Sequence, residues 1–162
     1  MTGDDIAPIT SRSEFVDAIR VAFALAAQDG AREILIVDPN FADWPLNDHA
    51  VVDSLTAWVD SRRSLTLFAD SFDEIARRQS RFVEWRRQWA HVVRCRTDPE
   101  LEAEQVPTIL LAAGATCVRL VDRVRYRGTV SSRPIDMTEC REAIDALLQR
   151  SAEAFPVTTL GL

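Results

Sequence analysis

The sequence EILIVDPN at residues 33–40 decides the fold class of this chain. Its apolar run, Ile34 to Val37, is typical of a strand that is buried on both faces, and Asp38-Pro39-Asn40 ends that strand. A similar apolar segment, SLTLFA, follows at residues 64–69, and a third strand is expected at residues 91–96. Short strands of this kind belong to the interior of a sheet that is covered on both sides.

Amphipathic helices are predicted between these strands. The first follows a capping-box arrangement of Thr10, Ser11 and Glu14 and ends at Asp29-Gly30. The second is expected to be capped by Asn47, and the third runs from Ser71 to Trp89 with a break near Ser80. Strands that alternate with helices require crossover connections, so this half of the chain predicts a parallel sheet.

The second half of the chain follows another pattern. Residues 108–112 and 116–121 flank Ala113-Gly114-Ala115 and predict an antiparallel hairpin. A short strand at residues 126–130 and a final helix at residues 138–154 follow. We therefore expect a single α/β domain over residues 1–162 with a mixed sheet, preceded by an extension at residues 1–11. An apolar tail at residues 155–162 is expected to pack down or to meet a partner.

Composition excludes several kinds of chemistry. All 19 basic residues are Arg, so no Schiff-base or phosphate-loop lysine exists. The net charge of −6 disfavours non-specific binding to nucleic acid and to anionic membranes. Three widely spaced cysteines, no signal peptide and no apolar run of membrane length predict a reduced, cytoplasmic chain. No cofactor motif and no metal motif is present, so neither a cofactor nor a metal is expected.

Basic charge is concentrated in two segments. Residues 61–96 hold 9 Arg and 4 acids, and residues 119–133 hold 5 Arg and 1 acid. Arg119, Arg123, Arg125 and Arg127 share odd parity, which on one continuous strand gives a strip that binds a phosphorylated ligand or, alternatively, protects a sheet edge. A turn at Asp122-Arg123 would instead separate Arg119 from the others. Arg119, Arg125 and Arg127 are the candidate binding residues. In the first segment, arginines lie among aromatic residues on the third helix, which suits either nucleic acid or a solvated face paired with Glu74 and Glu84. These arginines are Arg77, Arg78, Arg81, Arg86 and Arg87.

Asp38 and Asp70 form a second candidate site. Each comes at the end of an apolar strand, where parallel strands place ligand-binding residues. Two carboxylates at that edge suit a divalent cation, whereas Asp-Pro and Asp-Ser also simply end strands and cap helices. The cysteines are expected to be small core residues, because none has the electropositive setting that creates a thiolate.

Four stretches together resemble a family of proteobacterial proteins with a single, degenerate phospholipase D-like repeat. They are ILIVDPNFADWPL (34–46), RFVEWRRQWAHVVRCR (81–96), VRYRGTV (124–130) and PVTTLGL (156–162). The resemblance covers about Ser13 to Leu162 and implies a phospholipase D-like α/β/α sandwich that pairs with a second copy. The superfamily's H-x-K-x4-D signature is absent, since Val106, Thr108 and Ala113 stand in its place. The resemblance therefore implies the fold without the phosphodiesterase activity.

Three functions follow from these observations. The first is a non-catalytic module that acts through protein contacts, expected as a homodimer. The second is a binding module for a phosphorylated ligand or nucleic acid that uses the Arg-rich segments. The third is a metal-dependent enzyme that uses Asp38 and Asp70. The missing signature favours a role without catalysis, and no catalytic residue is assigned.

Overall fold

Eight strands form one sheet in the computed structural model, which describes residues 5–157. The strands are β1 (Ile6–Ile9), β2 (Glu33–Val37), β3 (Ser64–Phe68), β4 (Val93–Thr97), β5 (Thr108–Ala112), β6 (Thr116–Asp122), β7 (Arg127–Ser131) and β8 (Ala152–Glu153). Their order across the sheet is β1-β7-β6-β5-β2-β3-β4-β8. The two ends of the chain therefore supply the two outermost strands.

The sheet is mixed, as the sequence predicts. β2, β3 and β4 are parallel neighbours, which confirms the alternation of strands and helices in the first half of the chain. β5 lies antiparallel to β2, and β5 and β6 form the predicted antiparallel pair. β7, β1 and β8 are also antiparallel to their neighbours.

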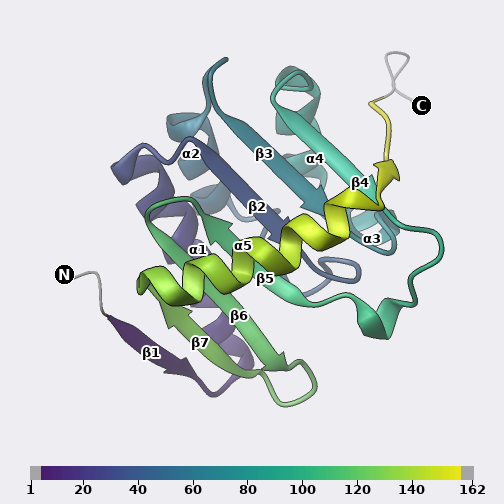
Figure 1. Cartoon of the computed structure of the whole chain (residues 1–162). Helices are drawn as coiled ribbons and strands as arrows, with labels where there is room; N and C mark the ends of the chain where they lie inside the picture. The colour runs from purple at the N-terminus through teal and green to yellow at the C-terminus, as the bar shows by residue number, and fades with distance from the viewer. Residues whose placement is uncertain (1–4, 158–162) are drawn as a thin grey trace.

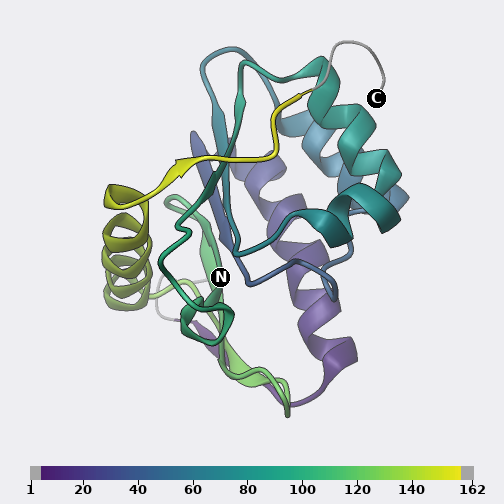
Figure 2. The same cartoon turned by 90° about the vertical axis from the view of Figure 1, so that its right-hand side faces the viewer.

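Helices cover the two faces of the sheet unequally. They are α1 (Arg12–Asp29), α2 (His49–Trp58), α3 (Asp73–Arg78), α4 (Ser80–Gln88) and α5 (Pro134–Gln149), with a 3-10 turn at Ala103–Gln105. Figure 1 shows α5 lying alone across one face, and Figure 2 shows the other helices on the opposite face. A larger core, which includes Phe15, Phe23 and Trp58, fills the side of α1 to α4. A smaller one, which includes Phe68, Cys140 and Ile144, lies under α5. No helix within residues 5–157 is long and apolar enough to cross a membrane.

The predicted ends of α1 are confirmed. The Ser11 hydroxyl accepts a hydrogen bond from the backbone N–H of Glu14 at 3.2 Å, and the Glu14 carboxylate accepts one from the N–H of Thr10 at 2.7 Å. At the other end, Gly30 has a φ of 67°, a left-handed conformation that glycine adopts without strain. The sequence alone predicts both ends of α1 because the capping contacts join residues no more than four positions apart.

The break in the third helical stretch is also confirmed, and it lies at Gln79. This side chain is buried, and its amide donates a hydrogen bond to the carbonyl of Phe41 at 2.9 Å. The predicted cap of the second helix is wrong by one residue, because α2 begins at His49 after Asp48. Asn47 instead accepts a hydrogen bond from the backbone N–H of Arg81 at 2.8 Å, which ties the start of α2 to α4.

Both ends of the chain differ from the prediction. Residues 6–9, expected within an extension, pair with β7 and bury Ile9. α5 begins at Pro134 and not near residue 138, because proline suits the first helical position. It also ends at Gln149, and residues 152–153 form β8 where the helix was expected to continue to residue 154. Of the apolar tail, residues 158–162 lie outside the described residues.

Candidate anion-binding cleft

Asp38 and Asp70 follow neighbouring strands, but Asp38 is turned into its own loop. One carboxylate oxygen accepts the Thr108 hydroxyl at 2.5 Å, and the other accepts the backbone N–H groups of Asn40 and Phe41 at 3.2 and 2.7 Å. Asp38 is only 8% exposed, whereas Asp70 is exposed. Within residues 5–157 no group of three or more His, Cys, Asp or Glu side chains is placed to hold a metal ion.

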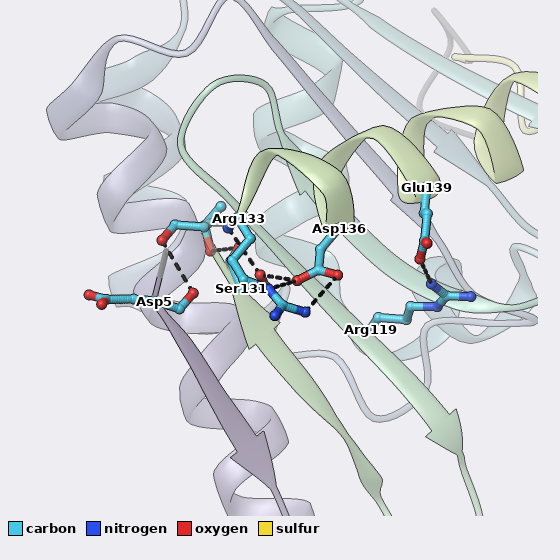
Figure 3. Close-up of polar contacts among 8 residues, drawn as sticks. Asp5, Arg119, Ser131, Arg133, Asp136 and Glu139 are labelled. Carbon is cyan, nitrogen blue, oxygen red and sulfur yellow. Dashed lines mark hydrogen bonds and ion pairs between the residues drawn. The ribbon is translucent and has the colours of Figure 1, made fainter. Parts of the chain in front are cut away.

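The arginines of the predicted strip each have a local contact. Arg119 lies on β6 and faces Glu139 of α5 at 3.6 Å, beside the cluster in which Arg133 and Ser131 bind Asp136 (Figure 3). The other two members of the strip, Arg125 and Arg127, lie in the β6–β7 connection and at the start of β7. Arg125 lies 3.7 Å from the Asp122 carboxylate, and Arg127 donates to the carbonyl of Thr10 at 2.6 Å. These contacts lie on β6, β7 and α5, whereas Asp38 is bound in its own loop by Thr108, so the structure shows no contact between this strip and Asp38 within residues 5–157.

Most arginines of α3 and α4 have surface partners. Arg78 pairs with Glu74 at 3.3 Å, and Arg87 pairs with Glu84 at 3.1 Å. Arg81 donates to the carbonyl of Asn47 at 3.1 Å. These contacts match the solvated helix face that the sequence offered as the alternative to nucleic-acid binding.

Arg86 is different from its neighbours because it lies on the buried side of α4. Its residue number places it next to Phe82 and Trp85 on the helix surface, and all three are buried. Arg86 is 7% exposed, and its guanidinium carbon lies 4.7 Å from the centre of the Phe155 ring. Its buried Nε has no hydrogen-bond acceptor in the part of the chain that the structure describes. A buried cationic donor without an acceptor is costly, so Arg86 marks a candidate site.

Arg86 opens onto a cleft of about 530 Å³ along the outer edge of β4. Arg94 and Arg96 of β4 also line this cleft, and we call it the Arg cleft after these three residues. Arg94 is exposed, and Arg96 donates to the hydroxyl and carbonyl of Ser151, each at 2.9 Å. Among the described residues that line the cleft, Glu153 is the one acidic residue. Three arginines and one glutamate give this lining an excess of positive charge, which suits an anion.

The cysteine in this cleft is not a reactive group. Burial raises the pKa of Cys95 to about 11, so its thiol stays protonated at neutral pH. The other two cysteines are buried under α5, where a shared hydrogen bond raises the pKa of Cys117 and lowers that of Cys140. All three are free thiols in the interior, which confirms their expected role as small core residues.

Sequence reasoning singled out Arg86 only as one of five helical arginines and missed Arg94 and Arg96. The sequence does carry a signal for Arg94 and Arg96. Apolar and charged residues alternate in Val93-Arg94-Cys95-Arg96, as in a strand with one solvent-exposed face. Val93 and Cys95 face the core on the side of α4, so Arg94 and Arg96 lie on the opposite face of β4 from Arg86. All three line the cleft because it lies at the edge of the sheet, where residues 151–157 cross from α5 toward α4 (Figure 2). No local pattern predicts that path.

The fold and the cleft define a class: an α/β domain with a mixed sheet of eight strands and an Arg-lined edge. The chain is similar in structure to TrmBL2, an archaeal chromatin protein whose structure is described as showing a novel mode of DNA binding. The TM-score is 0.62 at 8% sequence identity, and the match covers 95% of this chain and 55% of that chain. The likeness therefore concerns the fold, and the chain spans about half the length of that structure.

The predicted resemblance to a phospholipase D-like repeat is wrong. No family model and no curated protein sequence matches the chain, and a similar solved structure is that of a DNA-binding chromatin protein. The structure confirms the coarser part of the fold prediction, which is a single α/β domain with a mixed sheet. Two of the quoted stretches are instead explained by local structure, since ILIV lies in the interior strand β2 and RFVEWRRQ lies in the amphipathic helix α4.

Proposed function

We propose that this chain is a nucleic-acid-binding module that holds backbone phosphates in the Arg cleft. The observation that carries the proposal is the buried Arg86, whose Nε has no acceptor among the described residues, at a cleft shared with Arg94 and Arg96. A phosphate supplies oxygen acceptors and the negative charge that the cleft lacks. The DNA-binding role described for a structural neighbour supports this choice of ligand.

The net charge of −6 is compatible with nucleic-acid binding. The charge is segregated, because residues 1–60 hold 11 acids and 3 Arg whereas residues 61–96 hold 9 Arg and 4 acids. Screening limits the repulsion between exposed charges to about 10 Å at moderate ionic strength. A phosphate in the Arg cleft therefore experiences mainly its local guanidinium groups. Because few phosphates are contacted, binding is expected to be weak and its dependence on salt shallow but measurable.

The test is fluorescence anisotropy with a labelled oligonucleotide at low salt, followed by a salt titration. Wild-type protein should bind, and the affinity should fall as salt rises. Arg94→Gln should weaken binding and reduce the slope of log affinity against log salt by about one. Arg32 is exposed and outside the cleft lining, so Arg32→Gln is the matched control for loss of one charge. Equal effects of the two variants, or no binding at low salt, would contradict the proposal.

The predicted strip of Arg119, Arg125 and Arg127 is the competing location for the same ligand. Arg125 is the most useful of the three for a test, because its side chain is 76% exposed and its contact with Asp122 is long. If the strip binds phosphate, Arg125→Gln should weaken binding and Arg94→Gln should not. If the Arg cleft binds phosphate, Arg94→Gln should weaken binding and Arg125→Gln should not.

The homodimer expected from the sequence stays a prediction, and one of its two supports is gone. The implied pairing of phospholipase D-like repeats no longer applies. At the start of the apolar tail, Phe155 packs against Phe72 and the larger core of its own chain, so its ring is not a free surface for a second copy. Light scattering at micromolar concentrations distinguishes a dimer from a monomer directly.

A further inference from the structure

The segment after α5 carries an aromatic ring into the Arg cleft. We call residues 151–157 the C-terminal strap. Within it, the Phe155 ring stacks on Phe72 with a centroid distance of 5.4 Å and an angle of 10° between the planes. The Arg86 guanidinium carbon lies 4.7 Å from the centre of the same ring. Phe72 and Arg86 thus form the walls of a slot, and a flat side chain fills it.

Phe155 occupies this slot in an uncommon backbone conformation. Its φ is 49°, in the left-handed region that residues with a side chain rarely adopt. Such conformations persist where surrounding contacts impose them, and they gather at functional sites. The contacts here are Phe72 and Arg86, so ring stacking holds the backbone at Phe155 in place.

The strap is attached to the sheet mainly upstream of Phe155. β8 pairs two residues with β4, Glu153 with Arg96 and Ala152 with Thr97. The N–H of Ala154 adds one bond to the carbonyl of Cys95 at 3.0 Å. Beyond Ala154, the strap makes no backbone hydrogen bond within residues 5–157, and Pro156 has no N–H to donate. The ring can therefore leave the slot without breaking the β4–β8 pairing.

An aromatic wall and an opposing guanidinium are the surroundings in which proteins hold an unpaired nucleobase. A base is flat like the Phe155 ring, so it can stack between the Phe72 ring and the Arg86 guanidinium as that ring does. We propose that the slot between Phe72 and Arg86 is a nucleobase subsite, which Phe155 fills until single-stranded nucleic acid replaces it. A paired base is stacked on both faces inside a duplex, so a duplex does not enter the slot.

This inference rests on the proposed function and names its ligand as single-stranded. The test compares a labelled thymidine oligonucleotide with an abasic oligonucleotide of the same length, because the two carry the same phosphates. Phe155→Ala opens the slot, and its affinity for the thymidine strand should rise about five-fold or more. Its affinity for the abasic strand should stay as in the wild type.

Two further variants control for folding and for the wall of the slot. Phe155→Trp keeps the slot filled by a larger ring, so it should weaken binding of the thymidine strand and leave the abasic strand unchanged. In Phe72→Leu/Phe155→Ala the aromatic wall is lost, and the gain from Phe155→Ala should disappear. Thermal unfolding of each variant confirms that the comparison is made between folded proteins.

The outcomes separate this inference from the proposed function. Equal gains for the two strands, or no gain for the thymidine strand, overturn the nucleobase subsite. If the abasic strand still binds in a manner that depends on salt and on Arg94, the proposed function stands while the subsite fails. If neither strand binds at low salt, both proposals fail.

Discussion

The guanidinium of Arg86 is buried against Phe155, and its Nε has no acceptor within residues 5–157, which is an unfavourable setting for a cation. Desolvation of an unpaired charge costs several kcal/mol, and stacking on an aromatic ring offsets only about 2 kcal/mol of it. Phe82 and Trp85 surround the same helix face, and an apolar side chain would suit that face better. A residue that is unfavourable for folding is more easily explained by binding than by stability.

Replacing Arg86 with methionine should therefore separate stability from binding. Methionine keeps an unbranched apolar stem and removes the charge, so the free energy of unfolding should stay the same or rise by about 1 kcal/mol. Oligonucleotide binding should be lost at the same time. Urea denaturation and anisotropy measure the two effects, and Arg32→Met is the exposed control. A loss of more than about 2 kcal/mol in Arg86→Met would show that Arg86 is a structural residue.

Asp38 and Asp70 show what sequence reasoning cannot resolve for a single residue. Both follow apolar strands, and their sequence contexts predict the same role. Their difference comes from Thr108, which is 70 residues away along the chain and donates its hydroxyl to Asp38. The carboxylate of Asp38 also holds the N–H of Phe41, a residue with a φ of 60°. The surroundings of Asp38 are those of a residue that holds a loop, a role that the strand-end pattern left open.

Among the elements, α5 begins at a cluster of polar contacts. Arg133 binds the Asp136 carboxylate with two hydrogen bonds, at 2.7 and 3.2 Å, and the Ser131 hydroxyl adds a third at 2.5 Å (Figure 3). These bonds to Arg133 and then to Ser131 lower the pKa of Asp136 below its ordinary value. A carboxylate in the first turn also interacts favourably with the helix dipole.

This arrangement predicts a pH dependence of stability. Because the folded-state pKa of Asp136 is lower than the unfolded one, its contribution is complete above the unfolded value near 4 and is lost as pH falls through the folded value. Asp136→Asn should lower the melting temperature at pH 7, and the difference from wild type should shrink below about pH 4. Thermal unfolding at several pH values measures this, with Asp145→Asn on the same helix as the control. A difference that is constant with pH would contradict the assignment.

The ends of α5 also show why element boundaries were the weakest part of the sequence prediction. The start was placed too late because Ile135, in the first turn, is 64% exposed and breaks the apolar spacing. The end was placed too far along because Ala152 and Ala154 continue a helical composition. Arg96 holds Ser151 and redirects the chain along β4. By contrast, the strands β2 and β3 were predicted closely, since their apolar runs coincide with their buried length.

At the scale of the whole molecule, the described chain begins and ends at opposite edges of one sheet. β1 closes the side next to β7, and β8 closes the side next to β4. The sequence indicated the interior strands because they are apolar, but it gave no such signal for β1, where only one of four residues is buried. Pairing over more than a hundred residues, such as Ile9 with Gly128, is invisible to local patterns. This explains why residues 6–9 were placed in an extension.

The role of β1 can be tested with two isoleucines of the same strand. Ile9 is 2% exposed and belongs to the larger core, whereas Ile6 is 46% exposed. If β1 is an integral strand, Ile9→Ala should lower the free energy of unfolding by about 2 to 5 kcal/mol, because it leaves a cavity in that core. Ile6→Ala makes the same chemical change and should cost about 1 kcal/mol or less. Urea denaturation with a single transition measures both. Two small and equal losses would show that residues 6–9 are the extension that the sequence suggested, and that the sheet is complete at β7.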